Sequence, residues 1–165
     1  MNSSGVVDDS ILKEKLMKFF NKKRITIVAD VLDKKKSYSL RVVEWFINSY
    51  AKNRNIKYKV KNKTFDVYNS YKNEQMKSYS KKHFDLFRRT DKLVLNVDER
   101  KITTTIAQLN FFRWAIQNEI LTYVENHIKL IRDDLNLNIN KRDNKNTKMT
   151  QKVVVHKNKV IITFD

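Results

Sequence analysis

Lysines alternate with apolar residues in one short segment of the chain. Residues 52–63 hold six cations and no acid, and one side of a predicted strand there carries four of them: Lys57, Lys59, Lys61 and Lys63. At a rise of about 3.3 Å per residue, these ammonium groups would stand ~6.6 Å apart, close to the ~7 Å reach between successive phosphates of one nucleic-acid strand. The row could therefore follow a phosphate backbone without reading bases. The other interpretation is that the lysines protect an exposed edge strand from aggregation.

A second basic segment mixes cations with aromatic rings. It reads YSKKHFDLFRR over residues 79–89 and carries Lys81, Lys82, Arg88 and Arg89. The planar guanidinium of arginine suits phosphate or carboxylate, and this lysine-rich chain has few arginines. We therefore expect both arginines to contact an anion. The two phenylalanines of the segment, at 84 and 87, could stack on bases, but core positions are the simpler prediction for them.

Residues with catalytic potential do not form a constellation. The three histidines lie far apart without metal-ligand spacing, and the only glycine, Gly5, leaves no glycine-rich phosphate loop. Asp91 and the Glu99-x-Lys101 pair are similar to the carboxylates and lysine of some Mg²⁺-dependent nucleases. However, Asp98 and Glu99 fall in a predicted exposed turn, which argues against a metal site there. We expect a protein that is not an enzyme and needs no cofactor or metal. A metal-dependent nuclease is the enzymatic alternative.

The balance of charge indicates a negative partner. Lys plus Arg number 35 against 18 Asp plus Glu, which gives a formal net charge of +17 over 165 residues. Such an excess repels itself and weakens the compact state unless a negative partner offsets it. Nucleic acid is the commonest polyanion, so it is the first partner to consider. An AT-rich coding sequence would also enrich lysine, and that explanation stays open for part of the excess.

The rest of the composition sets limits on the class of protein. The chain has no cysteine, which excludes disulfides, thiolate metal sites and a cysteine nucleophile. No apolar run reaches the ~18 residues that would span a bilayer, so we expect no transmembrane segment. Hydrophobic residues make up 41%, enough for one core. With one glycine and no proline, turns that need a positive φ must use Asn, Asp or Lys.

Hydrophobic periodicity predicts the elements that would position these residues. Apolar spacing favours four helices, over about 9–23, 39–53, 65–82 and 105–134. The spacing of Thr105 and Gln108 is that of a capping box at the start of the last helix. Strands are predicted at 24–32 and 56–63, and residues 92–97 are predicted to pair with 100–105 in a hairpin that turns at Asp98 and Glu99. The predicted fold is α+β, with about four helices, short and mostly antiparallel strands, and a C-terminal β-hairpin.

The predicted domain organisation has four parts. Residues 1–8 form a disordered N-terminus and residues 9–135 a single α+β domain. Residues 136–150 form a polar linker rich in Asn and Lys. Residues 151–165 contain KVVVH and KVIITF, a strong signal for a hairpin that would extend the main sheet or act as an arm toward a partner.

Four longer strings resemble a group of viral proteins: YSLRVVEWF (38–46), FDVYNSYK (65–72), YSKKHFDLFRR (79–89) and TTTIAQLNFFRWAI (103–116). They are similar to a family of small, uncharacterised basic proteins of nucleocytoplasmic large DNA viruses, the giant viruses of protists and algae. The resemblance covers residues 37–134 and implies no catalytic residues. It implies a viral setting, either the virion or the viral factory in the host cytoplasm. Residues outside that range are expected to be particular to this chain.

These observations predict a non-enzymatic basic viral protein that binds nucleic acid, in the first place DNA, through its phosphates. It would act as a packaging or virion-associated factor. The contact would be carried by eight cations of the two basic segments: Lys57, Lys59, Lys61, Lys63, Lys81, Lys82, Arg88 and Arg89. The alternative is a minor capsid or scaffold protein whose positive surface meets acidic capsid proteins or an anionic membrane surface. In that case the C-terminal hairpin would insert beside a strand of a neighbouring protein.

Overall fold

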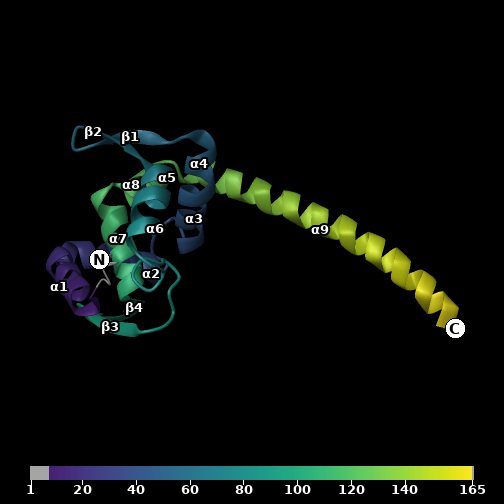
Figure 1. The fold of residues 1–165 in the computed structure, drawn as a ribbon, viewed down its shortest axis with the longest axis horizontal. Helices are drawn as coiled ribbons and strands as arrows, with labels where there is room; N and C mark the ends of the chain where they lie inside the picture. The colour runs from purple at the N-terminus through teal and green to yellow at the C-terminus, as the bar shows by residue number, and fades with distance from the viewer. Residues whose placement is uncertain (1–7, 165) are drawn as a thin grey trace, which may run out of the picture. The chain divides into compact units, whose positions relative to one another are not determined.

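A computed structural model describes the backbone of residues 8–164 and the side chains of residues 8–147 (Figure 1). The chain divides into two units, one up to Ile128 and one from Lys129 onward. The predicted disorder of residues 1–8 lies outside the described residues, except at Asp8. The carboxylate of Asp8 accepts a hydrogen bond from the Ser10 backbone N–H at 2.9 Å and caps the first helix.

The described residues form helices and two small antiparallel hairpins, so the predicted α+β class is confirmed. The helices are α1 (Asp9–Phe19), α2 (Lys22–Leu32), α3 (Leu40–Trp45), α4 (Ala51–Arg54), α5 (Val67–Asn69), α6 (Met76–Ser78), α7 (Ile106–Gln117), α8 (Ile120–Asn126) and α9 (Ile128–Phe164). The π-helical turns η1 (Phe46–Tyr50) and η2 (Ser70–Gln75) join α3 to α4 and α5 to α6. The strands are β1 (Lys57–Val60), β2 (Lys63–Asp66), β3 (Lys92–Val97) and β4 (Arg100–Thr105). The helical segments of the described chain therefore exceed the predicted number of about four.

The segment predicted as a strand at 24–32 is helical and forms most of α2. Asn21 caps this helix, because its side chain accepts a hydrogen bond from the Arg24 backbone N–H at 2.9 Å. One face of the helix carries Ile25, Ala29 and Leu32, which pack in a cluster with apolar residues of β3 and β4. Burial of this stripe outweighs the modest preference of β-branched residues for strands.

The predicted hairpin at 92–97 and 100–105 is confirmed. β3 and β4 pair in antiparallel register from Lys92 opposite Thr105 to Val97 opposite Arg100. Asp98 in the turn has a φ of 55°, as expected for a chain that lacks glycine here. Arg100 joins this hairpin to α2, because its Nη1 donates to the carboxylates of Asp30 at 2.9 Å and Asp33 at 3.2 Å.

The segment predicted as one strand at 56–63 is a hairpin. β1 ends at Val60, and Lys61 and Asn62 form a two-residue turn with φ of 49° and 65°. Two positive φ values are typical of a type I′ turn, whose twist matches that of the strands. β2 then returns with Lys63 opposite Val60 and Asp66 opposite Lys57. Sequence alternation cannot distinguish a continuous strand from one that reverses at a turn built of Lys and Asn.

Helix α7 lies at the centre of the first unit, between the two hairpins in Figure 1. It is buried on nearly all sides, as its eight buried residues show: Ala107, Gln108, Leu109, Asn110, Phe111, Phe112, Trp114 and Ala115. Its first turn is capped as predicted, because Thr105 Oγ1 accepts a hydrogen bond from the Gln108 backbone N–H at 3.1 Å. A helix that is buried on nearly all sides belongs in the core, and the rings of Phe65, Tyr71 and Phe84 pack near Trp114 on this one.

The predicted helix over 105–134 is interrupted. It separates into α7, α8 and the start of α9, with Glu119 in the left-handed region at a φ of 55°. The carbonyl of Asn118 just before this break accepts a hydrogen bond from the Tyr58 hydroxyl at 2.7 Å. The backbone at this break therefore binds Tyr58, the side chain that holds the β1–β2 hairpin against the core.

The C-terminal segment differs most from the prediction. Helix α9 runs without interruption from Ile128 to Phe164, across the predicted linker at 136–150 and the predicted hairpin at 151–165. The hairpin is wrong for the described residues of that range. Neither Gly nor Pro stands in this segment to end a helix, and once a helix has begun, each added residue gains a backbone hydrogen bond.

Candidate nucleic-acid interface

The basic segment 79–91 is an irregular loop that buried side chains of α7 hold in place. Asn110 Nδ2 donates to the carbonyl of His83 at 2.8 Å, and Gln108 Nε2 donates to the carbonyl of Leu86 at 2.8 Å. The Asp85 backbone N–H donates to the carbonyl of Ala107 at 3.2 Å. Buried amides that satisfy loop carbonyls fix the path of the backbone, because breaking them would leave polar atoms unpaired.

Within this loop, the apolar residues differ in burial. Phe84 and Leu86 are 1% and 5% exposed, whereas Phe87 is 41% exposed. The prediction that both phenylalanines are buried is therefore confirmed for Phe84 and wrong for Phe87. The Phe84 ring packs against Trp114 at a centroid distance of 5.8 Å and against Phe111 at 5.4 Å. The loop thus presents one aromatic ring to the core and one to solvent.

A hollow of about 370 Å³, which we call the arginine groove, opens between this loop, α2 and β4. One part of its lining is cationic, with Arg88, Arg89 and Lys92. The rest consists of apolar and neutral polar residues: Leu32, Leu40, Leu86, Phe87, Thr103, Thr104, Thr105 and Gln108. No acid is among these lining residues, so the groove offers three positive groups and no competing carboxylate in its own wall.

The neutral polar groups of the groove are partly occupied by one another. Thr104 Oγ1 donates to Gln108 Oε1 at 2.7 Å, and Thr105 Oγ1 receives the N–H of the α7 cap. Thr103, by contrast, is exposed on the outer face of β4. The groups with capacity for a ligand are therefore the Thr103 hydroxyl and the cations.

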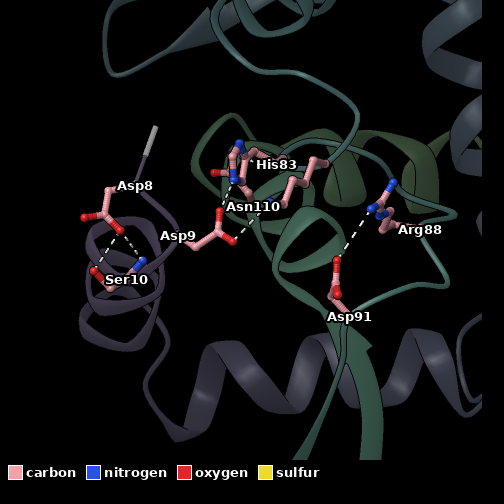
Figure 2. A network of polar contacts seen from close by, with 8 residues as sticks. Asp8, Asp9, Ser10, His83, Arg88, Asp91 and Asn110 are labelled. Carbon is pink, nitrogen blue, oxygen red and sulfur yellow. Dashed lines mark hydrogen bonds and ion pairs between the residues drawn. The ribbon is translucent and has the colours of Figure 1, made fainter. Parts of the chain in front are cut away.

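The three cations of the groove differ in their own contacts. Arg88 is the least exposed, and its Nη2 lies 3.6 Å from the carboxylate of Asp91, as Figure 2 shows. Arg89 and Lys92 are exposed and have no acidic partner among the described residues. An exposed guanidinium and ammonium beside an apolar wall suit an anionic ligand, because they lose little to competing pairs.

A second contact fixes the start of the loop to α1. His83 is buried, and its Nε2 donates to the Asp9 carboxylate, toward which the ring points in Figure 2. Lys82 Nζ lies 3.5 Å from the same carboxylate. The hydrogen bond from His83 is the main cause that lowers the pKa of Asp9 below its usual value, and the charge of Lys82 acts in the same direction.

The eight predicted binding residues do not form one surface. The β1–β2 hairpin and the β3–β4 hairpin beside the groove lie at opposite ends of the first unit (Figure 1). Lys57 and Lys59 share one face of β1, Lys63 lies on the other face, and Lys61 is in the turn. The predicted row of four lysines along one strand is therefore wrong. That these lysines contact nucleic acid stays a prediction.

The cations of the loop are also divided. Arg88 and Arg89 line the arginine groove, whereas Lys81 lines a smaller hollow of about 140 Å³ that also contains Glu44 and Asp85. Lys82 is engaged with Asp9. The arginines are thus the predicted residues that the structure brings together in an acid-free hollow.

Sequence reasoning missed two contributors to this groove. Lys92 follows Arg88 and Arg89 closely in the sequence, but it is the first residue of β3 and lies outside the predicted basic segment 79–89. Thr103 belongs to the string TTT at the end of β4. Lys92 pairs with Thr105, so the start of β3 lies beside the end of β4. The predicted hairpin of 92–97 with 100–105 already implied that these two strand ends are neighbours.

In the part of the chain that the structure describes, no group of three or more His, Asp or Glu is arranged to hold a metal ion. Within the same part, no helix has the length and apolar character needed to cross a membrane.

Comparisons with known proteins place the chain in a family. The sequence model of a family of unknown function, DUF7197, matches residues 6–163, well beyond the range 37–134 covered by the resemblance in the four strings. Uncharacterized protein L507 of Acanthamoeba polyphaga mimivirus is 38% identical over 136 residues, which cover 74% of this chain and 51% of that protein. This relative agrees with the resemblance to giant-virus proteins, and the chain spans about half of its length. No solved structure matches the chain. From the match over residues 6–163, the chain belongs to the DUF7197 family.

Proposed function

We propose that this protein binds nucleic acid through phosphate contacts in the arginine groove and has no enzymatic role. The observation that carries the proposal is the wall of the groove, where Arg88, Arg89 and Lys92 stand together and no acid is among the lining residues; the acid beside them, Asp91, faces Arg88 alone. A guanidinium can bind two phosphate oxygens at once, and a lysine beside it adds a further charge. The net charge of +17 would add long-range attraction to any polyanion.

The viral relative suggests where such an activity would be used. A packaging or virion-associated factor of a large DNA virus would meet the genome in the viral factory or in the virion. Binding through phosphates suits that role, because it is independent of base sequence. DNA is therefore the first nucleic acid to test.

The test is fluorescence anisotropy of a labelled DNA across a salt series from about 50 to 200 mM, where the slope reports the number of phosphates neutralised. We expect the Arg89→Ala Lys92→Ala variant to reduce the slope of log K against log salt by about 1.5, since each lost contact removes ~0.7–0.9. Both side chains are exposed, so the substitutions should leave the fold intact.

A charge-matched control separates local contact from general attraction. The Lys13→Ala Lys15→Ala variant removes the same charge from exposed positions of α1, neither of which lines the groove. We expect it to change the slope by less than about 0.5, as long-range attraction is screened beyond ~10 Å at 0.1 M salt. Equal slopes for both variants, or no binding by the wild type, would contradict the proposal.

The alternative role, as a minor capsid or scaffold protein, loses its strand-insertion mechanism. That mechanism needed a hairpin at 151–165, and the described residues of this segment are helical. Contact of the positive surface with an acidic capsid protein stays an alternative explanation if nucleic acid does not bind.

A further inference from the structure

We propose that the arginine groove takes one unpaired nucleotide of a single-stranded nucleic acid, with its base against the apolar wall and its phosphate on the cations. This inference rests on the proposed function and adds the class of ligand to it. It follows from the two-sided character of the groove. Leu32, Leu40 and Phe87 line it together with Arg88, Arg89 and Lys92.

The apolar wall distinguishes a nucleotide from a bare phosphate. A phosphate backbone alone requires a cationic surface that can stay hydrated, and leucine side chains add nothing to it. A base has a flat apolar face, and every base can stack on an aromatic ring. The combination of apolar and cationic walls therefore matches the combination of base and phosphate in one nucleotide.

Phe87 is the group that would receive the base. Among the residues whose side chains are described, Phe87 is exposed, whereas every other aromatic residue is buried or half-buried. Its position is fixed by its neighbours, because Leu86 is buried and the Phe87 backbone N–H donates to the Asp85 carboxylate at 2.9 Å. The backbone of Phe87 is thus held beside the groove before any ligand arrives, which lowers the entropic cost of placing its ring against a base.

The size of the groove limits what can enter. A hollow of about 370 Å³ is at the lower end of the range for small-molecule sites, ~300–1,000 Å³, and suits a single nucleotide unit. In a duplex both faces of each base are covered by neighbouring pairs, so only phosphates could reach the cations. A single strand can turn one base out of its stack at little cost. The groove should therefore prefer a single strand to a duplex.

The experiment compares two probes of about 12 nucleotides, a single-stranded DNA and the matching duplex, by fluorescence anisotropy. We expect the full chain to bind the single strand about tenfold more tightly than the duplex at the same salt concentration. Phe87→Ala should weaken single-strand binding by about tenfold and leave duplex binding and both salt slopes unchanged. Phe87→Trp should retain the preference, because an indole ring also stacks.

Met17→Ala is the matched control, because Met17 on α1 has the same exposed fraction as Phe87, 41%. It should bind both probes like the wild type. Equal weakening of single-strand and duplex binding by Phe87→Ala, or no weakening, would overturn this inference and leave the phosphate contact standing. If dAMP competes as tightly as the oligonucleotide, the ligand is a free nucleotide and the single-strand assignment is overturned. Failure of both probes to bind would overturn the proposed function itself.

Discussion

The arginine groove and the β1–β2 hairpin are both rich in cations, yet they offer a ligand different surroundings. On the hairpin, Lys59, Lys61 and Lys63 are exposed and point in different directions around a tight turn. In the groove, Arg89 and Lys92 lie beside an apolar wall in a hollow of about 370 Å³. Charge density alone is similar in the two segments. Concavity and partial removal of water favour binding in the groove over binding on the hairpin, because they strengthen each contact with a ligand.

The two regions are also supported differently. The loop beside the groove is tied to α7 through Gln108 and Asn110, both of which are buried. The hairpin contacts the core through two rings: Tyr58 stacks on Tyr123 at a centroid distance of 5.0 Å, and Phe65 lies 6.3 Å from Trp114. Burial raises the pKa of Tyr58 above its usual value, as expected for a ring packed against the core. A groove anchored in the centre of the molecule should keep its shape better than the tip of a hairpin.

The largest effect expected from this difference is on stability. Phe84→Ala should lower the free energy of unfolding by about 3–5 kcal/mol, because it leaves a cavity among the rings of Phe111 and Trp114. Val60→Ala in the half-buried face of β1 should cost less than ~1.5 kcal/mol. Urea denaturation followed by tryptophan fluorescence measures both. Similar costs for the two variants would show that the loop is no better anchored than the hairpin.

A smaller effect should follow from the amide beneath the groove. Gln108→Met keeps the length of the side chain but leaves the Leu86 carbonyl and the Thr104 hydroxyl without partners, at a cost of about 2 kcal/mol. Gln117→Met at the exposed end of α7 is the control and should cost less than ~0.5 kcal/mol. Thermal and urea denaturation give the comparison. A neutral Gln108→Met variant would mean that the loop holds its path without this amide.

The sequence predicted some of these features well, because they depend on neighbours along the chain. The cap of α7 by Thr105 and the pairing of β3 with β4 as a hairpin are local and were predicted correctly. Among the described residues, six of the seven non-glycine residues with positive φ are Asn, Asp or Lys, as the lack of glycine requires; Glu119 is the exception. Each of these features is set by the chemistry of a few adjacent residues.

Other features depend on contacts that a single sequence does not display. The residues of α2 favour a strand locally and become helical because Ala29 packs against Val97 and Ile102. The groove joins residues from Leu32 to Gln108, so no segment of the sequence contains it. The arginines were singled out by their chemistry and line the groove, whereas Lys92 and Thr103 join them there only through the fold. The row of lysines failed for the opposite reason, since a two-residue turn reversed the strand that carried it.

The hairpin lysines provide the direct test of the comparison in binding. If the groove carries the phosphate contacts, the Lys59→Ala Lys61→Ala Lys63→Ala variant should change the salt slope by less than about 0.5, although it removes three charges. The Arg89→Ala Lys92→Ala variant removes two charges and should change it by about 1.5. The three lysines have no ion-pair partner among the described residues, so their removal breaks no salt bridge there. A slope reduced by about 2 in the hairpin variant would transfer the site to the hairpin.

The smallest effect expected is a pH dependence confined to the groove side of the molecule. The bond from His83 lowers the pKa of Asp9, so ionised Asp9 stabilises the docking of α1 against the loop. A lowered pKa means that this stabilisation is complete above the unfolded value of 3.8 and is lost as the pH falls through the folded value. The free energy of unfolding of the wild type should therefore exceed that of Asp9→Asn near neutral pH, and the difference should shrink below about pH 4, as urea denaturation at several pH values would measure.

Glu14→Gln removes a carboxylate from the exposed Glu14–Lys18 pair of the same helix and should give little difference at any pH, because water and salt screen such pairs. A constant difference between wild type and Asp9→Asn across this range would show that Asp9 acts by packing rather than by charge. In that case the His83 contact would anchor the loop no more specifically than Tyr58 anchors the hairpin.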